Sequence, residues 1–374
     1  MSPTAASRRE ILLTPGPLML SPGVKQALCA CEISHRGPRF SRLLRRLSRN
    51  CRTLLGAGGH RIAFLSGPAT LGLEAALTSV LPPGARVLVL VNGTFAARLG
   101  EILATHGMRA VTLESGFGKA IDLRRVERTL AAAGERPWDM LVMAHHETSA
   151  GILNPVAAVG RIAQRHGVRF FVDATSSAGA EELDLGHDGV DVCVTSSGKC
   201  LHGVPGLAVV CVVPELLAKA TGAAPPFCLD VRLHVEYLDR LSQTPFTPSV
   251  PLFTALDRAV EELLAEGVAG RRHRYLRRRR AIVAAAGRLG QHPLPLPRGA
   301  AASSLVTLEL PRGVPFDAYS AGLRARGFVV YPCKPPLRES HFQVAVMGEV
   351  SDEEIARFVE ALGDVRDEVA ATRR

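Results

Sequence analysis

Short, almost continuous apolar runs alternate with helical patterns through the middle of this chain. The apolar runs lie at residues 86–91, 140–144, 168–172, 190–195 and 207–213. Amphipathic stretches at 95–106 and 156–166 have the periodicity of helices. Strands that are apolar at nearly every position are buried on both faces, and helices connect parallel neighbours. The pattern therefore predicts an α/β fold with a mainly parallel sheet covered by helices on both faces.

From about residue 255 the pattern changes. A long helix is expected over 252–290, before a proline-rich break at 292–299. The remaining expected elements are strands at 304–310, 328–331 and 342–346, a helix at 316–326 and a closing helix from Asp352. This order is typical of a compact α+β unit. We predict a large domain over 11–255 and a small C-terminal domain over 256–374, with segment 1–20 packing against the small domain.

Length and composition agree with this division. A chain of 374 residues suits a large domain plus a smaller one. Hydrophobic residues make up 47% and aromatic residues only 5%, which predicts a soluble protein with a core of Ala, Val and Leu. No apolar run approaches the roughly 20 residues that cross a bilayer. The first ten residues lack the apolar stretch of a secretory signal. We expect a cytoplasmic protein with no membrane partner.

The formal net charge of +10 raises the question of an anionic partner. Seven arginines lie between positions 36 and 52, and a second basic run, RRHRYLRRRR, spans 271–280. Basic stripes attract phosphate backbones, but the chain has no zinc-finger spacing, RNP motif or evident helix-turn-helix. The second run continues a helical pattern and is predicted to form a solvated helix face. We expect no nucleic-acid partner, although a basic surface would attract anionic substrates.

The eight cysteines show neither metal-binding nor redox spacing. They lie at positions 29, 31, 51, 193, 200, 211, 228 and 333, without a C-x-x-C pair. Several are within apolar runs, so buried reduced thiols are favoured over disulfides or metal ligation. No metal site is predicted.

Three polar residues follow expected strands: Thr148, Asp173 and Lys199. In open α/β sheets, ligands bind at the carboxyl ends of strands. Chemistry with pyridoxal phosphate (PLP) needs a lysine for the cofactor aldehyde, a carboxylate for the pyridine nitrogen and a phosphate cradle. Lys199 lies in the otherwise uncharged segment TSSGKCLHGVPGLAVV, where a lowered pKa is expected. Alternatively, Asp173 caps a helix and Lys199 is a solvated lysine.

Five motifs together resemble the class V aminotransferases of PLP fold type I. They are TPGP at 14–17, NGTFAAR at 92–98, HHETSAGILNP at 145–155, VDATSSAG at 172–179 and SSGKCLHGVPG at 196–206. The resemblance covers about residues 11–350 and implies a large domain with a mainly parallel seven-stranded sheet plus a small α+β domain. Within the family it is greatest to the branch that acts on 2-aminoethylphosphonate and pyruvate.

The resemblance implies a role for each matching residue. Lys199 would hold the aldehyde and Asp173 the pyridine nitrogen. Phe95 would stack on one ring face and Thr175 on the other, Thr148 would lie near the ring hydroxyl, and Ser196 would also contact the cofactor. Without the resemblance, core packing would be the simpler role for Phe95.

The phosphate cup would lie at Pro68, Ala69 and Thr70, ahead of a helix whose N-terminus favours anions. Alternatively, Thr70 is an ordinary helix N-cap. Thr247 of the partner subunit would complete the cup, which implies a homodimer with shared active sites. Pro68 departs from the family pattern because proline has no amide hydrogen to donate.

A second departure concerns the substrate. The family has an arginine that binds the substrate α-carboxylate, and Gln343 in HFQVAVMGE stands at that position. A neutral amide does not replace a bidentate guanidinium–carboxylate pair, and losing such a contact costs about 1.5–3 kcal/mol. The cations that could substitute for it are Arg36, Arg39 and Arg338, although an ordinary solvated arginine explains each as well.

The expected activity is ping-pong transfer of an amino group between a small amine or amino acid, such as 2-aminoethylphosphonate, and a keto acid such as pyruvate. This would be a step of phosphonate metabolism. Because of Gln343, a PLP-dependent lyase or an aminotransferase with an atypical substrate is the alternative. A cysteine desulfurase would need a mobile loop cysteine, for which Cys333 is the late candidate. A non-catalytic protein with this fold would have lost Lys199 or Asp173, and both are present.

Overall fold

Seven strands form the central sheet, in the order β2-β10-β9-β8-β5-β3-β4. Their bounds are β2 Arg61–Ser66, β3 Arg86–Val91, β4 Arg109–Glu114, β5 Met140–Ala144, β8 Arg169–Asp173, β9 Val192–Ser196 and β10 Leu207–Val212. Within this sheet β10 runs antiparallel to its neighbours β2 and β9, whereas the pairs from β9 to β4 are parallel. The computed structural model describes residues 9–30, 32–134, 136–218 and 225–371. The predicted mainly parallel sheet is confirmed.

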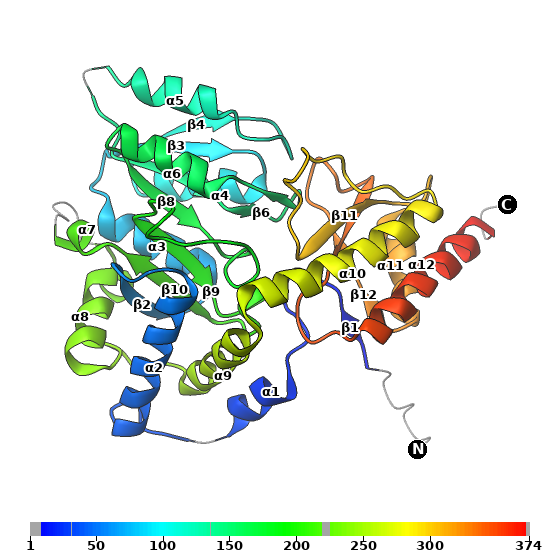
Figure 1. The fold of residues 1–374 in the computed structure, drawn as a ribbon, viewed down its shortest axis with the longest axis horizontal. Helices are drawn as coiled ribbons and strands as arrows, with labels where there is room; N and C mark the ends of the chain where they lie inside the picture. The colour runs from blue at the N-terminus through cyan, green and yellow to red at the C-terminus, as the bar shows by residue number, and fades with distance from the viewer. Residues whose placement is uncertain (1–8, 31, 135, 219–224, 372–374) are drawn as a thin grey trace.

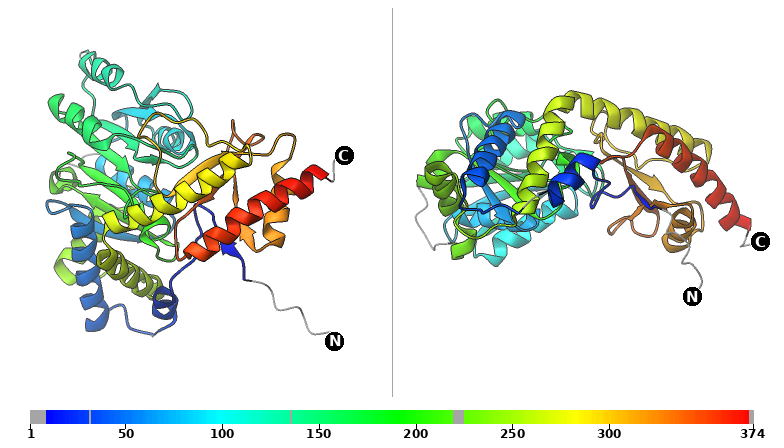
Figure 2. Two further views of the ribbon diagram at one scale, coloured as in Figure 1. Left: turned by 45° about the vertical axis from the view of Figure 1, so that its right-hand side comes forward. Right: turned by 90° about the horizontal axis from the view of Figure 1, so that it is seen from below.

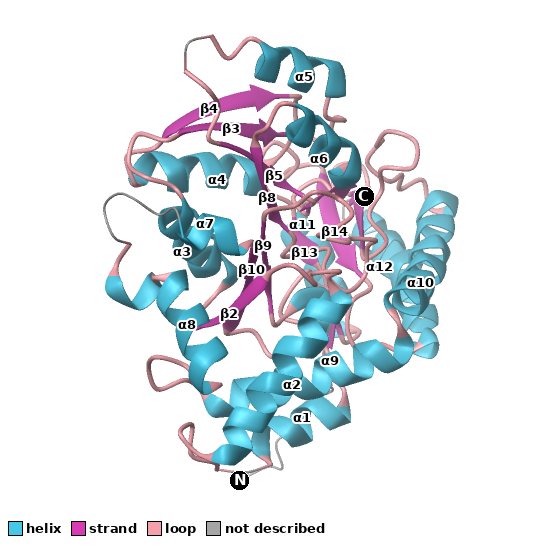
Figure 3. Cartoon of the chain, turned by 60° about the vertical axis from the view of Figure 1, so that its left-hand side comes forward, coloured by secondary structure: helices cyan, strands magenta, loops and turns pink. Residues whose placement is uncertain are grey.

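Helices cover both faces of this sheet, because successive strand residues point to opposite sides. In β10, Leu207 and Val209 belong to one buried cluster, and Ala208 and Val210 belong to the other. The helices of the first cluster are α2 Pro38–Leu54, α5 Leu123–Ala131, α6 Val156–Arg165 and α9 Val250–Glu266. Those of the second are α3 Ala69–Val80, α4 Thr94–Thr105, α7 Pro214–Ala218 and α8 Val231–Leu241 (Figure 3). Helix α1, Pro22–Cys29, packs on α9.

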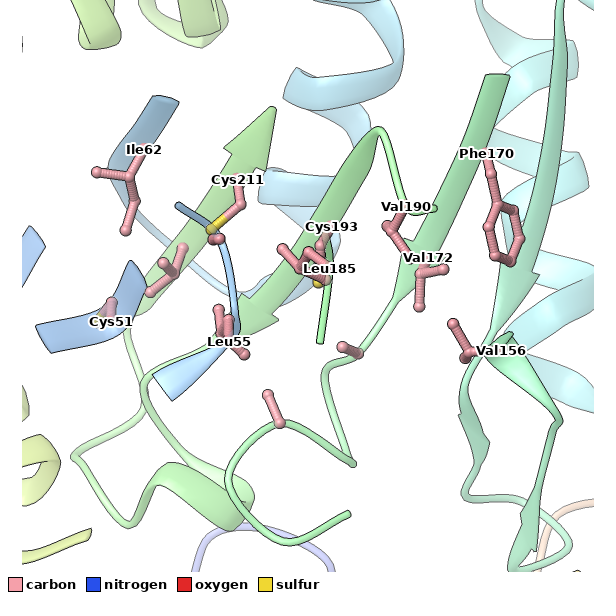
Figure 4. Close-up of a cluster of buried hydrophobic side chains, with 14 of the residues drawn as sticks. Cys51, Leu55, Ile62, Val156, Phe170, Val172, Leu185, Val190, Cys193 and Cys211 are labelled. Atoms are coloured by element: carbon pink, nitrogen blue, oxygen red, sulfur yellow. The ribbon is translucent and has the colours of Figure 1, made fainter. Parts of the chain in front are cut away.

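Cysteines contribute to the first cluster. Figure 4 shows Cys51, Cys193 and Cys211 among the apolar side chains of this layer. Burial raises the pKa of the Cys211 thiol to about 12. The seven described cysteines are free and five of them are buried, as predicted, whereas Cys31 lies outside the described residues.

A smaller lobe contains the C-terminal elements (Figures 1 and 2). Its three-stranded sheet has the order β11-β14-β13, formed by Leu305–Glu309, His341–Ala345 and Tyr331–Pro332. Strand β1, Ile11–Leu12, pairs with β12, Phe328–Val329. The helices are α10 Val268–Arg288, α11 Phe316–Ala325 and α12 Asp352–Ala371. One buried cluster unites Ile11 and Leu13 with Tyr275 and Phe342. The division at 255/256 stays a prediction.

Two expected elements differ from the observed ones. The helix predicted over 252–290 is two helices, because Gly267 between α9 and α10 has φ +76° and ψ 148°. The strand predicted over 328–331 is also two, since β12 pairs with the N-terminal β1 and β13 pairs with β14. In both cases the apolar pattern continues across the break, so periodicity alone does not detect it.

The prediction of a solvated face for the basic run at 271–280 is wrong for two of its arginines. Arg271 is buried and donates from Nη1 to the Cys200 carbonyl at 2.7 Å. Arg278 is buried and bonds from Nε to Asp352 at 3.0 Å. The reason is that α10 extends from the larger lobe into the smaller one and packs on α9 and α12 (Figure 1).

Neither a membrane-spanning helix nor a metal-binding cluster occurs among the described residues. No helix there has the length and apolar character needed to span a bilayer. The same residues contain no group of three or more His, Cys, Asp or Glu side chains placed to hold a metal ion.

Candidate active site

The two central candidates lie at the ends of adjacent parallel strands. Asp173 is the last residue of β8, and Lys199 follows β9 as the first residue of the 3-10 turn Lys199–Leu201. In the β8–β9 register, Asp173 pairs with Val194. Lys199 Nζ donates to the Pro15 carbonyl at 2.8 Å. Therefore the N-terminal TPGP motif meets the lysine in space.

Gly16 in that motif is required by its backbone conformation. Its φ is +131°, which L side chains rarely adopt. Space is not the constraint, because a Cβ at this position would be in ordinary van der Waals contact with the Lys199 side chain, 3.7 Å from Cγ and 3.9 Å from Nζ. Glycine therefore allows the backbone angle with which the segment turns beside the lysine.

The surroundings of Lys199 favour its neutral form. Burial lowers its pKa, and Arg98 lowers it further, whereas Cys200 and Asp173 raise it. This direction agrees with the expectation from the uncharged sequence around the lysine. A neutral amine is the form that acts as nucleophile and accepts protons.

Asp173 is only 5% exposed. Burial raises the pKa of its carboxyl group, while hydrogen bonding to Thr175 and the charges of Arg98 and Lys199 act in the opposite direction. Its Oδ1 accepts from the Thr175 backbone N–H at 2.9 Å. Thr175 therefore orients the carboxylate through its backbone.

Phe95 and Arg98 lie on one face of α4, three positions apart. The Arg98 guanidinium carbon is 4.9 Å from the centroid of the Phe95 ring, a cation–π contact. Arg98 was not predicted from the sequence, although it belongs to the NGTFAAR motif and its spacing from Phe95 is helical. It brings a positive charge to the vicinity of Asp173 and Lys199.

Ser176 connects the hairpin after β5 to the segment after β8. Thr148 Oγ1 donates to Ser176 Oγ at 2.6 Å. His146 donates from Nδ1 to the Ser176 carbonyl at 3.0 Å, and Cys200 Sγ contacts the same carbonyl at 3.3 Å. Ser176 thus links Thr148 to Cys200, the residue that follows Lys199. Ser196, the last residue of β9, is half-buried.

Several buried polar atoms in this region have no hydrogen-bond partner. They are Thr175 Oγ1, His146 Nε2 and Arg98 Nε. Unpaired buried polar atoms are costly and are normally satisfied by a ligand or water. Their position beside Asp173 and Lys199 fits a polar cofactor.

The predicted phosphate cup is at the start of α3. Pro68 is the N-cap, has no side-chain capping bond and is exposed, whereas Ala69 and Thr70 are half-buried. Gly67 N–H donates to the Gly206 carbonyl at 2.8 Å, which fixes this turn beside the loop that follows Lys199. The uncapped helix N-terminus suits an anion.

Other candidates lie on the surface of the chain. Arg36 donates to Gln243 Oε1 at 2.8 Å and to the carbonyls of Thr244 and Pro245 at 2.7 and 3.0 Å. It therefore anchors the loop that leads to Thr247, which is exposed. Arg39 at the start of α2 and Arg338 between β13 and β14 are exposed as well.

Gln343 in β14 is 3% exposed and fully engaged through its amide nitrogen. Nε2 donates to the carbonyls of Thr148 at 2.6 Å and Ser149 at 3.2 Å, and to Thr307 Oγ1 at 3.3 Å. Its amide therefore attaches the small sheet to the hairpin that carries Thr148.

Cys333 does not have the properties of a reactive loop thiol. The residue is 3% exposed, and burial raises the pKa of its thiol to about 12. The desulfurase alternative thus loses its candidate nucleophile, since the thiolate is the reactive form.

Adjacent strand ends of this seven-stranded sheet carry the buried carboxylate Asp173 and Lys199, a lysine whose pKa is lowered by burial. This arrangement defines a PLP-dependent enzyme of fold type I. The profile of the family described as Aminotransferase class-V matches residues 25–261. The chain belongs to the class V aminotransferases: it is a transaminase, and its cofactor is pyridoxal phosphate. The family and fold predicted from the motifs are confirmed.

Relatives match almost the whole chain. A 2-aminoethylphosphonate–pyruvate transaminase of Pseudomonas fluorescens is 32% identical, over 96% of this chain and 97% of its own. An alanine–glyoxylate aminotransferase of Nostoc sp. has a TM-score of 0.90 at 25% identity, over 98% of this chain and 97% of that structure. A pyridoxamine–pyruvate aminotransferase of Mesorhizobium loti also has a TM-score of 0.90 at 25% identity, with 98% and 94% covered.

Proposed function

We propose that this transaminase moves an amino group between a small amine or amino acid resembling 2-aminoethylphosphonate and a keto acid such as pyruvate. The similarity to transaminases named for these substrates supports it. The observation that carries it is the pair Asp173 and Lys199 at neighbouring strand ends, with burial lowering the pKa of the lysine.

Each site residue has a proposed task. Lys199 would hold the cofactor aldehyde, Asp173 the pyridine nitrogen, and Phe95 and Thr175 the two ring faces. Thr148 and Ser196 would bind polar ring substituents, and Pro68, Ala69 and Thr70 the phosphate. Bound PLP supplies a ring that accepts electrons from the reacting carbon.

Proton movement falls to the chain's own groups. When displaced by the substrate amine, Lys199 Nζ would accept the α-proton, for which its lowered pKa prepares it. Asp173 would keep the ring nitrogen protonated by placing a negative charge beside it. The Phe95 ring would exclude water from one face.

The anionic end of the substrate needs a different partner from the family's arginine. Gln343 already donates its amide hydrogens to backbone carbonyls and Thr307. We propose Arg39 as the cation that replaces it, with Arg36 and Arg338 as the other candidates. Arg39→Ala should then raise KM for the anionic substrate about tenfold or more, while Arg338→Ala should not. Unchanged saturation by Arg39→Ala would remove this assignment.

We also propose a homodimer in which Thr247 of the partner subunit completes the phosphate cup. Phe227 is 74% exposed and forms an edge contact with Phe246, next to Thr247. An exposed aromatic pair favours an interface. Phe227→Glu should dissociate the dimer in sedimentation experiments, and a dimer that persists would argue for another interface. The phosphonate pathway and the cytoplasmic location stay predictions.

The proposal is tested with purified, PLP-supplemented protein. We expect a yellow protein in which borohydride reduction fixes PLP covalently to Lys199. The variant Lys199→Ala is the control and should stay unlabelled. Adding 2-aminoethylphosphonate should convert the bound cofactor to pyridoxamine phosphate, and pyruvate should reverse the change. Turnover of the amine without this conversion would instead support the lyase alternative that Gln343 raises. A colourless, unlabelled protein would contradict the proposal.

A further inference from the structure

The N-terminus of α4, which carries Phe95, is capped by another part of the chain. Its N-cap residue is Gly93, which has no side chain to cap the helix. Instead, Glu147 Oε2 accepts from the Ala96 N–H at 2.8 Å, and Oε1 accepts from the Phe95 N–H at 3.3 Å. Glu147 belongs to β6, His146–Glu147, in the hairpin that β7, Ile152–Leu153, completes.

Ser149 completes this cap. Its Oγ accepts from the Thr94 N–H at 3.0 Å and donates to Glu147 Oε1 at 2.5 Å. The Ser149 backbone N–H donates to the same oxygen at 3.1 Å. The first three amides of α4 are therefore satisfied by two side chains of the hairpin.

The two segments approach so closely that only glycine fits between them. A Cβ on Gly93 would lie 2.4 Å from Glu147 Cγ and 2.7 Å from Ser149 Oγ. Next to it, Asn92 Nδ2 donates to Asn154 Oδ1 at 2.8 Å, which attaches the turn to the far end of the hairpin.

A carboxylate with 0% exposure is an expensive way to cap a helix, because a local Ser, Asp or Asn would suffice. Burial raises the pKa of Glu147, and the bonds from Ser149, Ala96 and Phe95 oppose this. A local cap would not connect Phe95 to Thr148, which directly follows Glu147 in the sequence.

We propose that Glu147 is a positioning residue that sets the Phe95 ring and the Thr148 hydroxyl at a fixed separation, so that both meet the cofactor. The inference rests on the proposed cofactor roles of these two residues. The small lobe holds the same hairpin through Gln343, which bonds the Thr148 and Ser149 carbonyls. The hairpin thereby links α4 to the small sheet.

The test compares two buried carboxylates. In Glu147→Gln, the amide group has nearly the same size but offers one acceptor oxygen instead of two. The control is Glu181→Gln, since Glu181 is 2% exposed and accepts from Ser303 N at 2.6 Å and Ser303 Oγ at 2.7 Å. It also pairs with Arg272 at 3.3 Å, and none of these bonds involves α4. Both changes should lower the melting temperature of the apoprotein.

Only Glu147→Gln should alter the bound cofactor. We expect its equilibrium dissociation constant for PLP to rise about tenfold to a hundredfold, as for loss of a charge-assisted hydrogen bond. The visible circular dichroism of the holoenzyme should change as well, because it reports the ring's surroundings. Glu181→Gln should keep the affinity and spectrum of the unchanged protein.

The inference is overturned if Glu147→Gln binds PLP with unchanged affinity and dichroism, or if both variants change them equally. Should Glu147→Gln fail to fold, Ser149→Ala provides the second variant, with a smaller change in the same direction expected and no change counting against the inference. Failure of the proposed function is distinguishable, because the unaltered protein itself would then not bind PLP on Lys199.

Discussion

Asp173 and Lys199 are held in an environment that opposes the charge of each. Burial raises the pKa of the acid and lowers that of the lysine, while the attraction between the two groups acts against both shifts. Arg98 favours the ionised acid and the neutral lysine at the same time. PLP chemistry needs an ionised acid together with a neutral lysine. Burying these two groups lowers the stability of the apoprotein.

Asp173→Asn should separate stability from activity. A folded pKa raised above the unfolded value gives stability that is present at low pH and is lost as pH rises through the folded pKa. Ionisation of the buried Asp173 therefore destabilises the apoprotein, and asparagine, which can still accept from the Thr175 N–H, removes this cost. We expect the apoprotein of this variant to be at least as stable in thermal unfolding as the unchanged apoprotein. The kcat of its holoenzyme should be about 100- to 1000-fold lower. Full activity would contradict the role of the carboxylate.

Residue types at strand ends were sufficient to predict Lys199, Asp173 and Thr148 as candidates. Arg98, Glu147 and Ser176 were not singled out, although each lies inside a quoted motif. Their importance comes from partners on other segments, such as the Glu147 bonds to α4. Sequence spacing carries no information about such contacts.

At the scale of elements, the break between α9 and α10 depends on one residue. Gly267 ends α9 and begins α10 with φ +76° and ψ 148°, a region that is almost exclusive to glycine. The turn lets α9 pack on α1 and α2 while α10 packs on α12. A continuous helix over 252–290 would not make both sets of contacts.

Gly267→Ala should lower the free energy of unfolding by about 1–3 kcal/mol through backbone strain alone. A Cβ at this position would meet no atom within 4 Å, so steric clash does not contribute. The control is Gly287→Ala inside α10, where the Cβ also meets nothing, and a gain of about 0.4–1 kcal/mol is expected. Urea unfolding of both variants measures the difference, and equal effects would show that the conformation of Gly267 is not decisive.

At the scale of the whole molecule, the two lobes are joined by buried polar groups. His202 follows the Lys199 turn, contacts the Tyr275 hydroxyl of α10 and accepts at Nε2 from the Gly348 N–H at 2.9 Å. Arg271 and Gln343 make further bonds across the same junction. The position of the small lobe is therefore coupled directly to the loop that carries the lysine.

This junction should make the protein sensitive to acid. Burial, aided by Arg271, Arg274 and Arg278, lowers the pKa of His202 well below its usual 6.5. As pH falls below 6.5, this histidine is protonated in the unfolded chain but stays neutral in the folded chain. The free energy of unfolding therefore falls by up to about 1.4 kcal/mol per pH unit for each such histidine. His202→Gln should reduce this slope between pH 7 and 5 in urea unfolding of the apoprotein. The exposed His187→Gln is the control, and equal slopes for both would refute the assignment.

The sequence by itself predicted five strands of the sheet and the candidate residues at one edge of it. Five almost continuous apolar runs correspond to β3, β5, β8, β9 and β10, because burial on both faces leaves a pattern that can be recognised locally. Thr148, Asp173 and Lys199 follow β5, β8 and β9, and they lie at one edge of the sheet because these three strands are parallel. By contrast, neither edge strand was predicted: β4 has mainly exposed or half-buried residues, and β2 was missed although four of its six residues are buried.

Only the tertiary structure decided how these pieces meet. It turned Arg271 and Arg278 inward, placed Pro15 against Lys199, and engaged Gln343 with the hairpin that caps α4. Each of these outcomes depends on residues far apart in the chain, whose proximity follows from packing of the two lobes. Hydrophobic periodicity records which side of an element is buried, but the partner of a buried polar group is chosen only when the lobes come together.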